Sequence, residues 1–242
     1  MHAVASIAAI MVLIWGGRAP GQPTTQPHPD PRKKTLEQLV TESKREAIFA
    51  PEVLTADGKP PSPEDSTSLK KAVALLESAN KAAANADFVT AAKDADEARR
   101  LWEGILGFGH HLTLSASVAA NTWSSVAKLA EGLRADFAKS EKDQPKTREY
   151  YESGKYAKAT ELARAIVDTR ATLVGKDSPS LIEPLRIMGA ALSELRAWQD
   201  ADAVLNRALA ISSETLGKTH PTTALVLDRY GWLQLSQGMS SK

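Results

Sequence analysis

The chain has 242 residues, of which 43% are hydrophobic and only 5% aromatic. This length allows one medium-sized domain with accessory segments, and a composition rich in alanine and poor in aromatic residues suits packed helices better than a sheet. The 30 Lys and Arg residues balance 29 Asp and Glu residues, so no overall positive field favours nucleic acid as a partner. The absence of Cys excludes disulfides and lipid attachment through an N-terminal cysteine.

An apolar run extends from Ala3 to Trp15 near the start of the chain. A helix of this length spans about 20 Å, less than the roughly 30 Å hydrocarbon core of a bilayer. Together with the Gly- and Pro-containing stretch that follows, it predicts a secretory signal peptide over residues 1–21. The mature chain is then periplasmic or secreted and has no stable membrane span. An uncleaved membrane anchor and a misassigned start codon are the alternatives, because the leader lacks Lys and Arg before its apolar run.

Residues 22–64 are predicted to form a mostly disordered linker with one short helix. The polar, proline-rich sequence QPTTQPHPD disfavours a helix after the leader. A short helix is predicted near residues 35–48, because Thr35 and Gln38 have the spacing of a capping box. A second stretch rich in Gly and Pro, residues 57–63, separates this helix from the rest of the chain.

Beyond residue 65, an aromatic residue followed three positions later by alanine recurs three times, and a glycine stands nineteen residues after each aromatic. The aromatic residues are Phe88, Tyr156 and Trp198, and the glycines are Gly107, Gly175 and Gly217. The last two members of each set are 42 residues apart, and a fixed period of this length indicates a repeat array. Apolar residues at three- and four-residue spacing predict two helices per unit, the second opened by the aromatic residue and capped by the glycine.

A small residue stands at the same place in the first helix of three units, which allows a neighbouring helix to pack closely. These small residues are Ala79, Gly189 and Gly231. Pro179 and Pro221, four residues after the last two glycines, mark positions where a new helix can begin. The predicted repeat domain covers residues 65–242, with units 66–107, 108–175 and 176–217 and a terminal helix over 218–238 that caps the array.

The second unit, residues 108–175, is 26 residues longer than the 42-residue period. The extra residues are expected within residues 123–148, as a lengthened first helix followed by a turn at Gln144–Pro145. Leu129, Leu133 and Phe137 recur at four-residue spacing in this insertion and predict an apolar stripe.

The repeated aromatic-x-x-Ala, the small residue in the first helix and the sequence RALAISSETLGKTHPTTALVLDRYGWL resemble tetratricopeptide repeats, in particular the 42-residue variety of kinesin light chains. The resemblance is strong over Tyr156 to Gly238, moderate over Ser66 to Gly107 and absent before residue 60. It implies an all-α fold, a right-handed helical-repeat solenoid of antiparallel helix pairs. The first helices of the pairs would line a concave groove that binds a protein or peptide.

The resemblance also implies which side chains face the groove. Carried onto this sequence, they are Glu183, Arg186, Ser193, Glu194, Asp228 and Trp232. Arg186 and Asp228 stand where the family usually has asparagines, which puts the usual contact with a peptide backbone in doubt. Trp232 is expected to be the most exposed aromatic residue, whereas the aromatic residues that open helices are expected in the core.

Residues 216–223, LGKTHPTT, contain a Gly-Lys-Thr sequence like the end of a phosphate-binding loop, followed by a histidine. A phosphate-binding loop needs a glycine five residues before Gly217 and a strand leading into it. Ser212 stands there instead, within a stretch that reads as an amphipathic helix. His220 takes the place of Ser178 and His110 in the other turns, so we expect it to bond backbone groups at a helix start rather than to act as a catalyst.

His110 and His111 are adjacent and have no further ligand at metal-binding spacing, so no metal or cofactor is expected. No arrangement of residues suggests an enzyme. We therefore expect an exported non-catalytic scaffold that binds a protein or peptide partner through the repeats. The alternative is a structural module that forms a homo-oligomer through the insertion in the second repeat; a hydrolase with unrecognised chemistry is a third hypothesis.

Overall fold

A computed structural model describes residues 53–240, with side chains up to Gln237. The predicted leader over residues 1–21 and the short helix near residues 35–48 lie outside the described residues. Within the described range the chain is all-α, as predicted. The helices are α3 (Pro63–Ala84), α4 (Phe88–Leu106), α5 (His111–Ala127), α6 (Glu131–Glu152), α7 (Tyr156–Val174), the 3-10 helix η2 (Pro179–Leu181), α8 (Ile182–Glu194), α9 (Trp198–Thr215) and α10 (Pro221–Ser240).

None of the helices described between residues 53 and 240 is both long and apolar enough to span a bilayer. The first of them, α3, begins at Pro63, earlier than the expected position at Ser66. The reason is a capping box, in which the Asp65 backbone N–H donates to Ser62 Oγ over 3.0 Å and the Ser62 N–H donates to Asp65 Oδ2 over 2.9 Å. The last two residues of the predicted linker are thus already helical.

The helix ends in the repeats are where the sequence pattern predicts them. Each of the three aromatic residues is the first residue of its helix, Phe88 in α4, Tyr156 in α7 and Trp198 in α9. Gly107, Gly175 and Gly217 follow these helices with φ angles of 86°, 100° and 89°. Glycine adopts such angles without a steric penalty, and this ends each helix at the expected residue.

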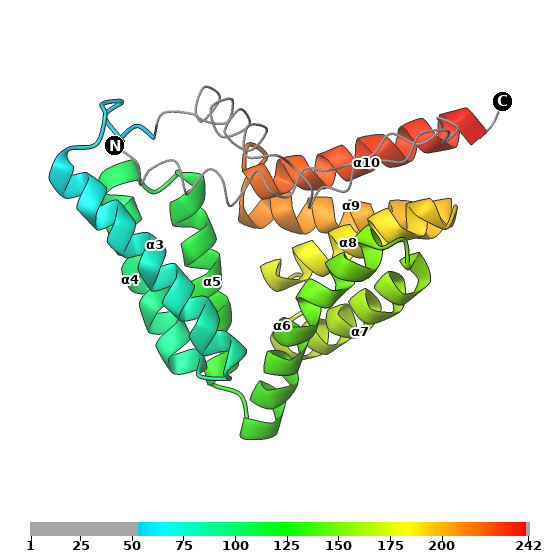
Figure 1. The fold of residues 1–242 in the computed structure, drawn as a ribbon, viewed down its shortest axis with the longest axis horizontal. Coiled ribbons are helices and arrows are strands. Elements are labelled where there is room, and N and C mark those ends of the chain that lie inside the picture. The colour runs from blue at the N-terminus through cyan, green and yellow to red at the C-terminus, as the bar shows by residue number, and fades with distance from the viewer. Residues whose placement is uncertain (1–52, 241–242) are drawn as a thin grey trace, which may run out of the picture. The chain divides into compact units, whose positions relative to one another are not determined.

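Consecutive helices pack in antiparallel pairs, in which we name the first member the A-helix and the second the B-helix. The helix α6 packs along α7, and α8 packs along α9 (Figure 1). Each B-helix also packs on the following A-helix, α7 on α8 and α9 on α10, and the A-helices α6, α8 and α10 contact one another in that order. This part of the chain is a helical-repeat solenoid.

The insertion in the second unit differs from the expectation. The chain breaks at residues 128–130, between α5 and α6, and α6 continues through Pro145 instead of turning there. The expected turn at Gln144–Pro145 is therefore wrong. Because α6 pairs with α7 as α8 pairs with α9, α6 is the A-helix of a complete repeat, and the additional element is α5. The helix α5 packs on the preceding B-helix α4, as α10 packs on α9, and no B-helix of its own follows it.

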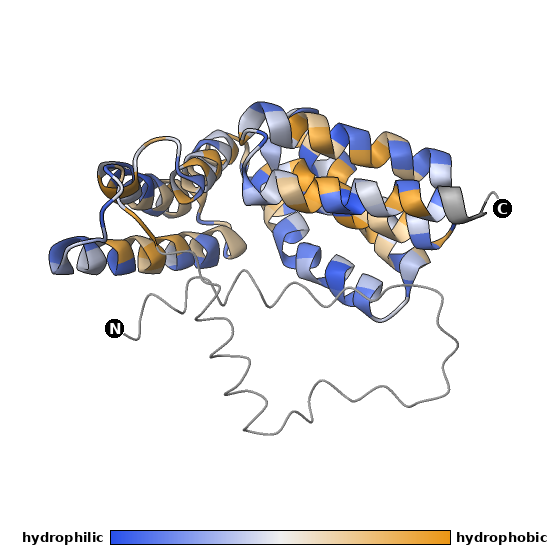
Figure 2. Ribbon diagram, turned by 90° about the horizontal axis from the view of Figure 1, so that it is seen from above, coloured by the Kyte–Doolittle hydropathy of each residue, from blue (hydrophilic) through white to orange (hydrophobic). Residues whose placement is uncertain are grey.

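The core consists of small and apolar residues along the helix faces that meet (Figure 2). In α4 they are Phe88, Ala91, Ala95, Ala98, Trp102 and Leu106. In the pair formed by α8 and α9, a Cβ atom added to Gly189 of α8 would lie 2.5 Å from Leu205 Cγ of α9. The small residue predicted in the A-helix is therefore required there, because a larger one would collide with the B-helix.

The apolar stripe predicted in the insertion faces inward at two of its three positions. Phe137 is fully buried in α6 and packs edge-to-face on Phe88 of α4, with ring centres 5.6 Å apart. Leu129 is partly buried against the same cluster, and only Leu133 is exposed. Burying one large apolar side chain stabilises a fold by about 1.5–3 kcal/mol, so the stripe contributes to the core of the monomer.

Candidate functional site

Three A-helices place charged side chains next to one another. Arg148 of α6 donates from Nη2 to Glu183 Oε1 of α8 over 2.6 Å. On α8 itself, Arg186 donates from Nε to Glu183 Oε2 over 2.9 Å and from Nη2 to Glu183 Oε1 over 2.8 Å. One carboxylate thus binds two guanidinium groups, and this joins α6 to α8.

The charges of this cluster stabilise one another. Burial alone would raise the pKa of Glu183, but the guanidinium groups of Arg186 and Arg148 outweigh it and hold the pKa of this carboxyl below its usual range. Burial would likewise lower the pKa of Arg186, and the Glu183 carboxylate reverses the shift, so that the pKa is raised. Glu183 and Arg186 therefore remain charged, and removing Glu183 would leave the buried Arg186 without the carboxylate that it binds.

Aromatic residues extend this cluster towards α10. The guanidinium carbon of Arg229 in α10 lies 5.7 Å from the ring centre of Tyr151 in α6, and the rings of Tyr151 and Tyr156 are 5.6 Å apart. Glu194 and Asp228 lie close enough to act electrostatically on Tyr151 and Arg186, respectively. We name this set the A-helix surface; its members are Arg148, Tyr151, Glu183, Arg186, Glu194, Asp228 and Arg229.

The six residues predicted to face the groove differ in their exposure. Glu194 and Asp228 are exposed, and Glu183 and Trp232 are partly exposed. Arg186 and Ser193 are each only 6% exposed. Arg186 is paired with Glu183, and Ser193 Oγ donates to the Gly189 carbonyl oxygen over 2.9 Å. Their polar groups therefore serve contacts within the chain.

Sequence reasoning missed the contribution of α6 and misplaced the exposed aromatic residue. Tyr151 stands 42 residues before Ser193, so the repeat spacing points to it once α6 is recognised as an A-helix. Trp232 is only partly exposed, whereas Phe108, in the turn before α5, is 65% exposed. The indole of Trp232 is partly covered because α10 packs on both α8 and α9.

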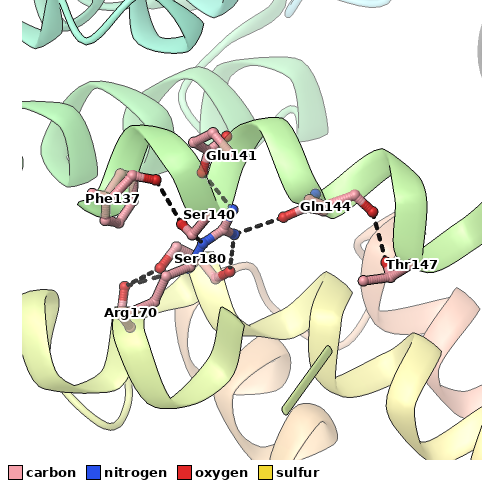
Figure 3. A network of polar contacts seen from close by, with 8 residues as sticks. Phe137, Ser140, Glu141, Gln144, Thr147, Arg170 and Ser180 are labelled. Atoms are coloured by element: carbon pink, nitrogen blue, oxygen red, sulfur yellow. Dashed lines mark hydrogen bonds and ion pairs between the residues drawn. The ribbon is translucent and has the colours of Figure 1, made fainter. Parts of the chain in front are cut away.

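A second polar cluster surrounds Arg170 of α7, which is buried against α6 (Figure 3). Its Nε donates to Ser140 Oγ over 2.9 Å, and its Nη1 donates to Gln144 Oε1 over 2.6 Å and to the Ser180 carbonyl oxygen over 2.7 Å. Its Nη2 lies 2.8 Å from Glu141 Oε1 in an ion pair. Burial lowers the pKa of Arg170, and the Glu141 carboxylate opposes this shift. The network holds α6, α7 and η2 together.

A cavity of about 260 Å³ lies beside this network, lined on one side by α5 and on the other by α6, η2 and α8. Its charged lining groups are Glu141, Arg170 and Glu183, and each of them is already paired within the chain. A ligand there would have to compete with these internal ion pairs. The A-helix surface, with its exposed carboxylates, is the better candidate for binding a partner.

The histidines at helix starts act as caps, as predicted. The Thr222 backbone N–H donates to His220 Nδ1 over 3.1 Å, and the Leu112 N–H donates to His110 Nδ1 over 3.3 Å. Ser178 Oγ does the same for the Ser180 N–H over 3.3 Å. The turn that resembles a phosphate-binding loop is therefore the beginning of an A-helix, preceded by the B-helix α9 rather than by a strand.

His220 also connects two helix starts. Its Nε2 lies 3.2 Å from the His111 carbonyl oxygen and 3.1 Å from Ser115 Oγ, both in α5. Burial lowers the pKa of His110 and His220, and burial together with the neighbouring histidines lowers the pKa of His111 to about 4. All three rings are therefore neutral near pH 7. Between residues 53 and 240, no three His, Asp or Glu side chains are grouped so as to hold a metal ion.

Comparison with known proteins agrees with this architecture. The tetratricopeptide repeat family model matches residues 187–222, which run from the middle of α8 through α9 to the first residues of α10. No curated protein matches the chain. The matched range includes the Trp198 helix start, the Gly217 cap and the His220 turn, the same features that recur around α4 and α7. Residues 187–222 therefore contain a tetratricopeptide repeat.

Proposed function

We propose that this protein is an exported, non-catalytic scaffold that binds a protein or peptide partner through the A-helix surface, on the concave side of its repeats. Repeats of this family suggest a role in protein–protein interaction. The observation that carries the proposal is the convergence of charged and aromatic side chains from α6, α8 and α10 on one surface.

The surface supports a partner with both charge signs and an apolar part. Glu194 and Asp228 are exposed carboxylates, and Arg148 retains 40% exposure of its side chain although it pairs with Glu183. Tyr151 adds a partly buried ring that offers apolar area next to these charges. The internal ion pairs hold the charged groups in place before a partner arrives, and this favours specificity.

The function is tested by reversing one exposed charge on the surface and one away from it. Glu194→Arg changes an exposed residue of the A-helix surface. Glu214→Arg, the control, changes a glutamate on the B-helix α9 that is also exposed. Full chains carrying each change are used to capture binding proteins from an envelope extract. We expect the first variant to retain about a tenth or less of a captured partner, and the second to match the unmodified chain. Equal capture by both variants would reject the A-helix surface.

Arg186 is a poor choice for such a test because it is 6% exposed and holds Glu183. Its reversal would disturb the fold and the surface together.

Export rests on the apolar leader over residues 1–21. The test is the mass of the chain recovered from cells after fractionation into cytoplasm, membrane and soluble envelope. We expect a chain shortened by the leader in the soluble envelope fraction. A full-length chain in the membrane fraction would support the uncleaved anchor, and a full-length cytoplasmic chain would contradict export.

The structure does not favour self-association through the insertion, the alternative function, because Phe137 of its apolar stripe is buried in the core of the same chain.

A further inference from the structure

The last helix has one exposed face with few charges. Between Pro221 and Gln237, the exposed residues of α10 are Ala224, Leu227, Asp228, Gly231, Gln234 and Leu235. Their spacing of three and four residues places them on a single stripe. Leu227 is 46% exposed and Leu235 is 63% exposed, so the stripe has an apolar character that a helix at the end of a solenoid normally lacks.

The same face of the preceding A-helix is covered by a helix. In α8, the residues 42 positions before Ala224, Leu227 and Gly231 are Ile182, Leu185 and Gly189, and all are buried. Gly189 lies so close to Leu205 of α9 that an added Cβ would be 2.5 Å away from Leu205 Cγ. By contrast, a Cβ added to Gly231 has no neighbouring atom within 4 Å among the described residues. The helix α10 thus has a surface suited to a closely packed helix, and that surface is open.

The stripe is symmetric in sequence about Gly231. Leu227 and Leu235 stand four positions before and after it, and Asp228 and Gln234 stand three positions before and after it. Two such helices packed antiparallel about a two-fold axis at Gly231 place each Leu227 against Leu235 of the second copy. Asp228 then faces Gln234 of the second copy, whose amide donates one N–H to Asp202 of its own chain over 3.5 Å and has a second N–H for the Asp228 carboxylate.

We propose that α10 pairs with α10 of a second copy of this chain, antiparallel and with Gly231 at the two-fold axis. The missing Cβ at Gly231 lets the two backbones approach closely, and the four leucines lose their contact with water. The stripe from Ala224 to Leu235 is about 17 Å long, so the interface is smaller than that of a permanent dimer. The dimer is therefore concentration-dependent. Asp228 belongs both to this stripe and to the A-helix surface, so a partner that contacts Asp228 would compete with the dimer, whereas Arg148 and Glu194 lie outside the stripe.

The first test measures association of the full chain by sedimentation over a range of concentrations. Leu235→Glu changes the stripe, and Val89→Glu changes a residue of α4 that is equally exposed, at 64%. We expect the unmodified chain and the Val89 variant to form dimers with the same dissociation constant. The Leu235 variant should dissociate at least about tenfold more readily, because a charge then faces Leu227 of the second copy.

Gly231→Ala provides a variant that keeps the fold, since no atom in the part of the chain that the structure describes lies near the added methyl group. It should weaken the dimer by about tenfold or more while its thermal unfolding is unchanged or shifted upward. A chain that stays monomeric at every concentration overturns the proposal. Dimers that survive both the Leu235 and the Gly231 changes also overturn it, because another surface then joins the copies.

The absence of Cys allows a direct test of the geometry. A single cysteine introduced by Gly231→Cys lies on the proposed axis and should form a disulfide-linked dimer under mild oxidation, much faster than the Val89→Cys control. Equal rates for the two variants would contradict a two-fold axis at Gly231.

Discussion

The helices α8 and α10 occupy the same place in successive repeats but differ in what covers them. In α8 nearly every residue is buried, because α7 packs on one side and α9 on the other. The helix α10 packs on α8 and α9 and leaves its remaining face exposed. Gly189 and Gly231 stand at the corresponding position of the two helices, yet among the described residues only Gly189 has a side chain within 4 Å of an added Cβ. The comparison shows that the role of a residue in the repeat depends on whether a B-helix follows.

The starts of the two helices differ in a second way. Ser178 caps the turn before α8, whereas His220 caps α10 through the neutral form of its Nδ1. A serine cap does not titrate, whereas the His220 ring, whose pKa is lowered by burial, gains a proton at acid pH. The same turn is therefore insensitive to acid in one repeat and sensitive to it in the next.

The largest difference between the helices should be seen at the leucines. Leu205 is fully buried against Gly189, so Leu205→Ala is expected to lower the free energy of unfolding by about 2–5 kcal/mol. Leu235 is 63% exposed in the monomer, and Leu235→Ala should change the free energy of unfolding by no more than about 0.5 kcal/mol. Urea unfolding followed by circular dichroism, in dilute protein, measures both values. Similar losses for the two variants would mean that α10 is covered within the monomer.

Changing each of the two glycines to alanine should have an effect of intermediate size on the free energy of unfolding, and the two effects should have opposite signs. Gly189→Ala places a methyl group against Leu205 and should lower the free energy of unfolding by about 1–3 kcal/mol. The methyl group of Gly231→Ala meets no atom of residues 53–237, and this change should raise the free energy of unfolding by up to about 1 kcal/mol, since alanine favours the helical conformation. Thermal unfolding of the two variants checks the signs. Destabilisation by Gly231→Ala in dilute protein would contradict the open face.

The smallest effect on stability is expected from the histidines at the starts of α5 and α10. The pKa values of His110, His111 and His220 are lowered in the folded chain, that of His111 to about 4, from an unfolded value of 6.5. The contribution of these histidines to the free energy of unfolding is therefore complete above the unfolded pKa. It is lost as the pH falls from 6.5 towards 4, because the unfolded chain binds more protons than the folded chain.

Serine, which caps the turn before α8 as Ser178, provides the control substitution for His220. His220→Ser retains an oxygen cap and should change stability at about pH 7.5 by no more than about 1 kcal/mol. It should also reduce the loss of stability between about pH 7.5 and about pH 5 relative to the unmodified chain. Unfolding in urea at both pH values measures this difference. An identical loss in the variant would show that the His220 cap does not contribute to acid sensitivity.

Local signals in the sequence were sufficient to predict the helix boundaries of the repeats. Phe88, Tyr156 and Trp198 begin B-helices, and the glycines after them adopt positive φ angles that end those helices. The role of His220 was also predictable, because it shares its position with His110 and Ser178. These features depend on a few neighbouring residues, so they are visible without the rest of the fold.

Pairing between helices was not predictable in the second unit. Both α5 and α6 have the length of an A-helix, and α5 also begins with the turn typical of one, so the spacing alone does not show which of them pairs with α7. The exposure of Arg186 was misjudged for a related reason. Its partner Glu183 is visible at i−3, but Arg148 contacts that carboxylate from α6, a helix that was expected to end before reaching it.

The sequence by itself therefore determined the period, the ends of the B-helices, the caps and the presence of a tetratricopeptide repeat, because each depends on local backbone conformation and on short-range spacing. Only the tertiary structure decided that α6 forms a repeat with α7, that Phe137 is in the core and that Gly231 is open. These properties depend on which helices come into contact, and contacts between distant segments are set by the packing of whole helix faces rather than by any short stretch of residues.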